Sequence, residues 1–236
     1  MNQAAAFDTG QINGLSVRQL IDLRATTTPD AAFLIDPETG TTTSYGELRE
    51  HCCSVAAQIS RNGVKPGEAV AYALTNGPAS AIAILGIMYG GYLATAINLV
   101  AGNATISYVL THSRARLVLA QTQTQNLLAA ALDSHDRPPQ VLVVDDGFFD
   151  SVDGADELPP LTHQDDGLLM YTSGTTGRPK GVVLRQSSVL AGGANAVLAH
   201  ELTVADRALC VLPLYHINGL CVTIMGPMLS GGSVVV

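Results

Sequence analysis

The sequence Tyr171-Thr172-Ser173-Gly174-Thr175-Thr176-Gly177-Arg178-Pro179-Lys180-Gly181 joins two short apolar segments. It contains three glycines, four Ser or Thr hydroxyls and two cations, and it has no acid. Glycines let backbone N–H groups approach a ligand closely, and hydroxyls donate further hydrogen bonds. A lysine adds a compact positive charge that suits phosphate oxygens. The composition therefore predicts a loop that wraps a polyphosphate; the alternative is a Gly/Thr-rich hairpin loop without a ligand.

The spacing of the glycines distinguishes this loop from the common phosphate-binding loops. A Walker A loop requires G-x-x-x-x-G-K-[ST] at the start of a helix, and a dinucleotide fingerprint requires G-x-G-x-x-G. Here Gly174 and Gly177 are three residues apart, and Lys180 follows three residues later. Residues 167–171 and 182–184 each read as an apolar strand, so the loop should join strand to strand. Phosphate affinity would then come from the loop's own donors and from Lys180.

The composition is that of a globular protein with a large apolar core. Of 236 residues, 47% are hydrophobic and 14% are charged, and the net charge is −8. An acidic chain without a basic patch argues against a nucleic-acid partner. Between Arg137 and Arg178 lie eight acids and no cation, and their scattered spacing favours a solvated connector over a metal site. The four cysteines lack a C-x-x-C motif, and the N-terminus lacks a secretory signal, so we expect reduced cysteines and a cytoplasmic protein.

One uncharged segment resembles a membrane span. No Asp, Glu, Lys or Arg occurs in residues 69–113, and residues 79–97 are nearly all apolar around Gly86-x-x-x-Gly90. A transmembrane helix with a dimerisation face would explain this pattern. However, glycines and polar residues interrupt the segment, and no Lys or Arg flanks it. We favour a helix that is buried on all sides, and we expect no membrane span.

Apolar patterns predict alternating strands and helices along the chain. Ser16 should cap a helix over 17–28, and the Ser44-x-x-Glu47 capping box should start a helix that ends at Asn62-Gly63. Further helices are expected over residues 78–93, 104–113, 123–132 and 219–229. Another helix, capped by Ser187-Ser188, should end at about His200. Strands are expected over 31–35, 41–43, 68–74, 117–120, 141–144, 167–171, 182–184, 208–212 and 233–236. Such alternation is typical of a largely parallel sheet covered on both faces.

The loop closely resembles the phosphate-loop signature of adenylate-forming (AMP-binding) enzymes, the acyl- and aryl-CoA synthetases, peptide-synthetase adenylation domains and firefly-type luciferases. Other segments resemble that family in the same order. They are residues 43–48 and 63–68, the apolar Leu85-Gly86-Ile87-Met88-Tyr89-Gly90-Gly91-Tyr92, and Leu212-Pro213-Leu214-Tyr215-His216-Ile217-Asn218-Gly219-Leu220. The resemblance implies a layered αβαβα fold with largely parallel sheets flanked by helices. It implies a first α/β subdomain with an acidic connector over 1–165, and the phosphate loop with the start of a second subdomain over 166–236.

The resemblance also implies a reaction and the residues that serve it. A carboxylic acid would react with ATP to give an acyl-adenylate, and CoA would then displace AMP; Mg²⁺ would accompany ATP in the full-length enzyme. The β- and γ-phosphates would be held by Thr172, Ser173, Gly174, Thr175, Thr176, Gly177 and Lys180. Lys180 can alternatively form a salt bridge within the fold. His216 would line the carboxylate pocket, or it would be a buried histidine bonded to backbone. The Tyr215-His216 segment has no acid to pair with an amino-acid ammonium, which favours an acid without an amino group.

The chain departs from the family pattern in length. Family members are about twice as long, and the Mg²⁺-binding Glu, the ribose-binding Asp and the small C-terminal domain with its catalytic Lys have no counterpart here. The catalytic set is therefore incomplete, and we expect negligible adenylation by this chain alone. The resemblance implies a CoA ligase of fatty acid metabolism. The alternatives are an adenylation domain that loads a carrier protein and a non-catalytic interaction module. The particular acid, the acceptor, the origin of the short length and the oligomeric state stay open.

Overall fold

Six strands form the larger of two sheets in the computed structural model, which describes residues 13–133, 135, 137–145, 147–149, 158–172 and 178–236. In spatial order they are β6 (Gln140–Val143), β5 (Leu117–Ala120), β3 (Ala69–Ala73), β4 (Leu93–Ala96), β7 (Asp166–Thr172) and β8 (Lys180–Arg185). The strands from β6 to β7 are parallel, and β8 is antiparallel to β7. The carboxyl ends of five strands therefore share one edge, which is where parallel α/β sheets commonly bind ligands.

Each face of the larger sheet belongs to a different core. Along β3, Val70 and Tyr72 join one buried cluster, whereas Ala71 and Ala73 join the other. This alternation follows from the two-residue period of a strand. Because both faces are covered, the strand has no polar position, which explains why its sequence reads as a continuous apolar run.

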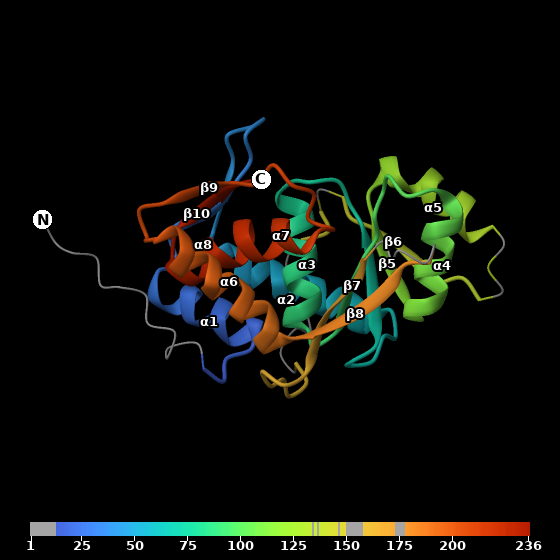
Figure 1. Ribbon diagram of the computed structural model, residues 1–236, viewed down its shortest axis with the longest axis horizontal. Coiled ribbons are helices and arrows are strands. Elements are labelled where there is room, and N and C mark those ends of the chain that lie inside the picture. Colours follow the sequence, from blue (N-terminus) through green and yellow to red (C-terminus); the bar gives the residue numbers. More distant parts are fainter. Residues whose placement is uncertain (1–12, 134, 136, 146, 150–157, 173–177) are drawn as a thin grey trace, which may run out of the picture.

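Helices cover both faces of this sheet. The outer face carries α4 (Asn103–Ser113) and α5 (Gln125–Leu132), which lie to the right of the sheet in Figure 1. A short 3₁₀ turn (Thr122–Thr124) precedes α5. The other face packs against a helical layer between the two sheets. That layer contains α1 (Val17–Thr27), α2 (Tyr45–Arg61), α3 (Pro78–Tyr89), α6 (Gln186–His200), α7 (Ile217–Leu220), a π-helical turn (Cys221–Met225) and α8 (Gly226–Ser230).

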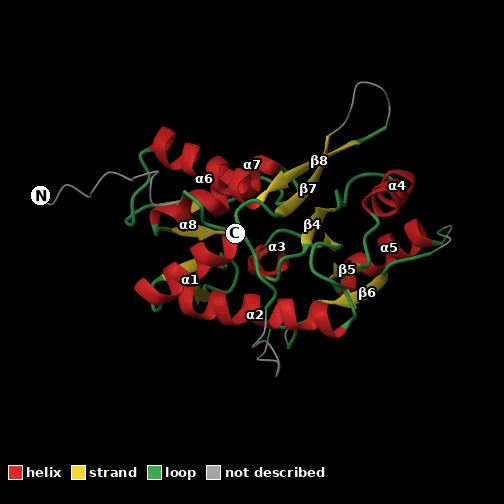
Figure 2. Cartoon of the chain, turned by 90° about the horizontal axis from the view of Figure 1, so that it is seen from below, coloured by secondary structure: helices red, strands yellow, loops and turns green. Residues whose placement is uncertain are grey.

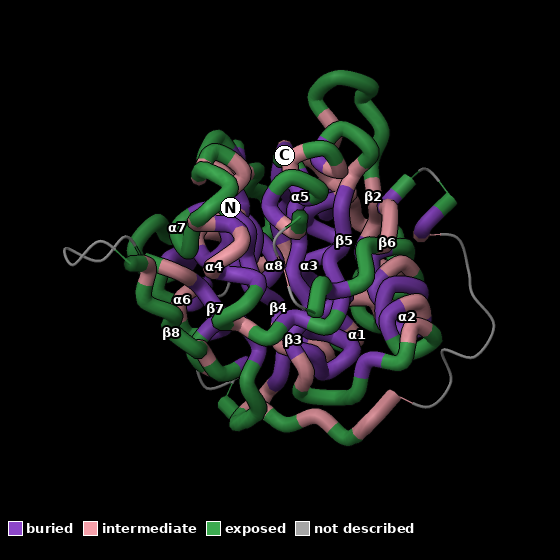
Figure 3. Tube along the Cα trace, turned by 90° about the vertical axis from the view of Figure 1, so that its right-hand side faces the viewer, coloured by how far each residue is buried: buried purple, intermediate pink, exposed green. Residues whose placement is uncertain are grey.

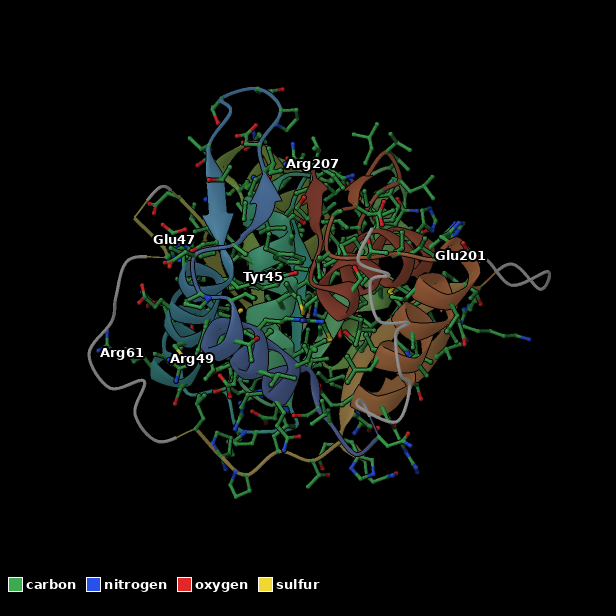
Figure 4. The ribbon with its side chains drawn as sticks, turned by 90° about the vertical axis from the view of Figure 1, so that its left-hand side faces the viewer. Tyr45, Glu47, Arg49, Arg61, Glu201 and Arg207 are labelled. Carbon is green, nitrogen blue, oxygen red and sulfur yellow. The ribbon has the colours of Figure 1, made fainter. Side chains whose placement is uncertain are left out.

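Four strands from the two ends of the chain form the smaller sheet. Their spatial order is β2 (Thr42–Ser44), β1 (Ala32–Ile35), β10 (Ser233–Val235) and β9 (Arg207–Leu209), and β1, β10 and β9 are parallel. Tyr45 links the two ends, since its hydroxyl donates to the carbonyl of Gly232 at 2.8 Å and its ring stacks on Phe33 (Figure 4). Each sheet therefore contains strands from before and after residue 165. The boundary between two subdomains that we expect at this residue stays a prediction.

The apolar helix of the sequence is α3, at the centre of the molecule (Figure 3). It lies so close to α2 that a Cβ atom at Gly86 would be 2.5 Å from Cβ of Val55. A glycine is therefore required at this crossing because any side chain would force the helices apart. In the described part of the chain, α3 and the other helices are too short or too polar to cross a membrane.

The prediction of largely parallel sheets flanked by helices is confirmed, and so are both helix-start predictions. Ser16 caps α1 in a reciprocal pair with Gln19, and Ser44 caps α2 in the same way with Glu47. Most other elements lie within a few residues of their expected positions.

Three expectations about local structure were wrong. The helix over 78–93 ends at Tyr89 because Gly91 adopts a positive φ of 81°, and the next residues form the unpredicted strand β4. Ser187-Ser188 caps nothing, since α6 already begins at Gln186, whose buried side chain is fixed by other helices. The helix over 219–229 is three pieces, with a π-helical turn between α7 and α8.

Candidate functional site

The phosphate-loop sequence connects the two strands of a hairpin. Strands β7 and β8 pair antiparallel, with Tyr171 opposite Gly181 and Thr172 opposite Lys180, and Figure 2 shows the hairpin at one edge of the molecule. The predicted strand–loop–strand arrangement is therefore present. Ser173, Gly174, Thr175, Thr176 and Gly177 lie outside the described residues. Thr172 ends β7 before the loop, and Lys180 begins β8 after it.

Lys180 projects from an exposed position at the start of β8. Within the described residues it forms no ion pair, so the alternative of a salt bridge inside the fold finds no partner there. Its neighbour Gly181 is exposed, but side chains of β7 lie close to it: a Cβ atom at this position would lie 3.3 Å from Cε1 of Tyr171. The small residue thus lets the ring of Tyr171 lie across the strand pair at the base of the loop.

Tyr171 connects the hairpin to α4. Its hydroxyl lies 2.9 Å from Nδ1 of His112, and the two rings meet edge to face with centroids 5.7 Å apart. Burial, together with the nearby phenol of Tyr108, raises the pKa of Tyr171 to about 12. The phenol is therefore neutral at physiological pH and serves as a hydrogen-bonding anchor.

The segment around His216 is held against the same sheet edge by backbone contacts. Asn76, which follows β3, donates to the carbonyl of Leu212 at 2.9 Å and accepts from the N–H of Leu214 at 3.0 Å. Gly219 sits where a Cβ atom would lie 2.6 Å from the carbonyl oxygen of Pro213. The glycine of this motif is therefore needed for a close backbone approach.

His216 is the N-cap residue that precedes α7, and its side chain is exposed. Its ring packs against the ring of Tyr215, with centroids 4.8 Å apart. The alternative of a buried histidine bonded to backbone does not hold, because the side chain is open to solvent and to a neighbouring pocket.

A pocket of about 310 Å³ brings the two motifs together. Thr172, Arg178 and Pro179 from the loop ends line one part of it, and Tyr215 and His216 line another. The remaining lining is largely apolar and comes from the end of β4, the link to α4, one side of α4 and the end of β7: Ala96, Ile97, Asn98, Ala101, Thr105, Ile106, Val109 and Tyr171. Lys180 is not among the lining residues of this pocket.

The contribution of α4 was absent from our sequence predictions. Thr105 and Val109 are four residues apart on α4, which is the spacing of one helix face, and this signal indicates a side that packs against something. The sequence does not say what the face meets. In the structure it faces the loop base and His216 across the pocket.

The described residues offer no metal centre. No group of three or more His, Cys, Asp or Glu side chains in this part of the chain is arranged to hold a metal ion. The acidic connector lies partly outside the described residues, including Asp146, Asp150, Asp153, Asp156 and Glu157. The four cysteines are free thiols.

Comparison with known proteins gives consistent matches along most of the chain. The sequence model of the AMP-binding enzyme family matches residues 21–236. Sulfoacetate–CoA ligase from Cupriavidus necator is 39% identical over 222 residues, covering 92% of this chain and 44% of that enzyme. Feruloyl-CoA synthase from an Amycolatopsis species is 31% identical over 198 residues, covering 83% of this chain and 39% of that enzyme. The chain therefore spans less than half the length of these relatives.

A solved structure confirms the fold. The protein from Rhodopseudomonas palustris, assigned as a long-chain-fatty-acid CoA ligase, superposes with a TM-score of 0.85 at 23% identity. The match covers 95% of this chain and 57% of that one. At this identity the likeness concerns the arrangement of strands and helices rather than the chemistry of the site.

Proposed function

Because the chain belongs to the family of AMP-binding enzymes, we propose that it forms the N-terminal part of an ATP-dependent acyl- or aryl-CoA ligase. In the first step a carboxylate oxygen bonds to the α-phosphorus of ATP. The bond between the α-phosphorus and the oxygen that bridges to the β-phosphorus breaks, and pyrophosphate leaves. In the second step the thiol of CoA, after losing its proton, bonds to the acyl carbon, and AMP leaves. The products are an acyl-CoA, AMP and pyrophosphate.

One observation carries this proposal: two motifs that are distant in sequence line a single pocket. Thr172 and Arg178, at the ends of the loop, share the pocket with His216. The pocket lies at the edge where the parallel strands end, which supports a ligand site there. Nucleotide and acid would thus be held side by side, and such positioning is itself a large part of the catalysis of a bimolecular reaction.

The loop would act on the leaving group. Thr172, Ser173, Thr175 and Thr176 would donate hydrogen bonds to the β- and γ-phosphates, and Gly174 and Gly177 would let backbone N–H groups do the same. Charge accumulates on the pyrophosphate as the bond to the α-phosphorus breaks. Lys180, exposed and without an ion-pair partner in the described residues, would stabilise that charge.

The acid would occupy the pocket with its carboxylate toward His216 and Arg178. Both side chains can donate to an anionic oxygen, and the apolar lining from α4 suits a short carbon skeleton. Pocket residues of the described chain include no carboxylate, which supports an acid without an amino group.

ATP would bring Mg²⁺ on its phosphate oxygens, and the ion would neutralise part of their charge. No ligand for it is assigned to the described residues, which contain no suitable group. We expect this chain alone to bind ATP weakly and to have negligible adenylation activity, because relatives are more than twice as long. The longer enzyme would work in the cytoplasm, where ATP and CoA are available.

The test uses the longer protein that contains this chain and measures carboxylate-dependent exchange between ATP and pyrophosphate. We expect Lys180→Ala to slow exchange by about an order of magnitude or more, because it removes stabilisation of the leaving group. Arg185→Ala is the matched control, since Arg185 is an exposed cation at the far end of the same strand. Unchanged exchange in Lys180→Ala would refute the proposed role.

A second measurement separates CoA from a carrier protein as the acceptor. Mass spectrometry of the products with CoA present should find the acyl-CoA. Accumulation of acyl-adenylate without thioester would instead support the carrier-loading alternative. No exchange with any carboxylate tested would favour a non-catalytic interaction module.

A further inference from the structure

A second recess lies at the opposite edge of the larger sheet. It has a volume of about 480 Å³ and is lined by residues from the end of α4, the link to β5 and the link to β6. Arg114, Arg116 and Arg137 line it together with His135. Strands β5 and β6 begin at this edge, whereas β7 ends in Thr172 at the other, so the arginine recess is separate from the pocket at the phosphate loop.

Within the described residues, little of the positive charge in the arginine recess is paired with an acid. Among the described residues, its one ion pair joins Arg116 Nε to Glu68 Oε1 at a long 3.7 Å, and the Arg116 side chain is largely exposed. No hydrogen bond or ion pair joins the side chain of Arg114 or Arg137 to another described residue. Three guanidinium groups that share one recess repel one another, and an anion bound between them would relieve that repulsion. This concentration is notable in a chain of net charge −8.

The backbone holds the lining residues in place. Arg114 ends α4 in a left-handed conformation with φ of 55°, which is uncommon for a residue with a side chain. Arg116 is fixed between neighbouring strands, since its N–H donates to Ala69 and its carbonyl accepts from Gln140. The ring of His135 contacts the hydroxyl of Thr111 at 2.7 Å.

The bonds of Thr111 define how His135 is oriented. The Thr111 hydroxyl donates its only hydrogen to the carbonyl of Ser107 at 2.8 Å, so His135 Nε2 must be the donor in the contact with Thr111. The recess therefore has a fixed imidazole beside its three guanidinium groups, and planar guanidinium forks match phosphate oxygens well.

We propose that the arginine recess binds a small phosphate-bearing anion at a site distinct from the phosphate loop. The ligand is either free pyrophosphate or a phosphate group of a larger metabolite such as ATP. This site requires neither the proposed CoA ligase activity nor an intact phosphate loop, so it can be tested on the chain by itself.

The experiment titrates pyrophosphate, and separately ATP, into this chain by calorimetry at low ionic strength. We expect saturable pyrophosphate binding that weakens as salt is added, because the recess is open to solvent. The double variant Arg114→Gln/Arg137→Gln should weaken that binding about tenfold or more, since it removes two charge-assisted contacts. If the double variant loses affinity for ATP and for pyrophosphate equally, a phosphate group of a larger metabolite suffices as the ligand. If it loses affinity for pyrophosphate alone, the free anion is the ligand.

Two matched variants locate the binding. Arg207→Ala removes an exposed arginine from the smaller sheet (Figure 4) and should leave pyrophosphate binding unchanged. Lys180→Ala removes the cation of the phosphate loop, so saturable pyrophosphate binding that persists in this variant belongs to a site other than the loop. Loss of pyrophosphate binding in Lys180→Ala, with normal binding in the double arginine variant, would overturn the proposal and would still agree with the proposed function.

A measurement on the unmodified chain guards against misfolding of the variants. Phenylglyoxal modifies accessible arginines, and the modified positions can be identified by mass spectrometry. Pyrophosphate should protect Arg114 and Arg137 but leave Arg207 reactive. Equal reactivity of all three with and without pyrophosphate would contradict the proposal.

Discussion

Nδ1 of His112, on α4, lies 2.9 Å from the hydroxyl of Tyr171, at the base of the phosphate loop. The two residues are 59 positions apart in the chain, so the contact ties the hairpin to a helix that packs on the outer face of the sheet. Because burial raises the pKa of Tyr171 to about 12, its hydroxyl keeps its proton and can donate to an unprotonated Nδ1. The strand that leads into the loop, β7, is therefore attached to α4 by a side-chain contact as well as to its neighbouring strands by backbone hydrogen bonds.

The first prediction concerns this anchor. Tyr171→Phe should keep the packing across Gly181 and lose the hydrogen bond, which costs about 0.5–1.5 kcal/mol of unfolding free energy. Urea unfolding of Tyr171→Phe, His112→Ala and the double variant forms a double-mutant cycle. We expect a coupling energy of about 0.5–1 kcal/mol for residues in contact. Strictly additive losses would mean that the two side chains do not stabilise each other.

The second prediction concerns the glycine that follows His216. Gly219→Ala would place a Cβ atom 2.6 Å from the Pro213 carbonyl, so the segment that carries His216 must move. We expect a loss of more than about 1 kcal/mol, although alanine normally favours a helix by about that amount. Gly102→Ala is the matched control, because its added Cβ meets nothing within 4 Å. Similar thermal midpoints for the two variants would contradict the close approach.

Local signals predicted the elements of this fold better than they predicted the site. Ser16 and Ser44 are followed three residues later by Gln19 and Glu47, and this pattern alone locates two helix starts. The strand β4 was missed because Leu93-Ala94-Thr95-Ala96 carries one β-branched residue and follows an apolar helix without a polar break. Its position depends on pairing with β3 and β7, which sequence pattern does not encode.

The pocket illustrates the same limit. The sequence singled out His216 and the loop, but not the face of α4 that completes the pocket with Thr105 and Val109. A helix face reveals that it packs, whereas the partner is set by tertiary structure. The same reasoning explains the wrong cap at Ser187: Gln186 starts α6 one residue earlier because other helices occupy its side chain.

The third prediction concerns Gln186, a fully buried polar residue that joins three helices. Its Oε1 accepts from the N–H of Val17 at 3.0 Å, and its Nε2 donates to the carbonyl of Met88 at 3.2 Å. Gln186→Ala leaves the N–H of Val17 buried and unpaired, whereas the carbonyl of Met88 still accepts from the N–H of Gly91. We therefore expect a loss of about 1–3 kcal/mol of unfolding free energy in urea.

The control for this prediction is Gln164→Ala. Gln164 is exposed and accepts one hydrogen bond from Arg185, and its loss should cost less than about 1 kcal/mol. A loss of the same size in both variants would show that the buried amide does not hold the helices together.

The last prediction concerns pH and the start of α2, where Glu47 lies at the surface (Figure 4). The Ser44 N–H donates to Glu47 Oε2 at 2.7 Å, and this bond holds the pKa of Glu47 below its usual value. A carboxylate whose pKa is lower in the folded state stabilises the protein above its unfolded pKa of about 4.5, and that contribution disappears as the pH falls through the folded value. Stability should therefore decline in acid partly through Glu47.

Glu47→Gln tests this because α1 already uses a glutamine, Gln19, in the same capping role. The variant should keep the capping hydrogen bond but lose the attraction between the carboxylate and the helix dipole. At pH 6 and low salt this loss should lower the unfolding free energy by about 0.3–1 kcal/mol. As the pH falls below the lowered pKa of Glu47 in the folded state, the unfolding free energies of the two proteins should converge, because Glu47 is then protonated. The reverse change, Gln19→Glu in α1, should raise the unfolding free energy, and this gain should also disappear as the pH falls. Thermal midpoints of the three proteins between pH 3 and pH 7 measure this, and parallel curves for all of them would contradict the role of the charge.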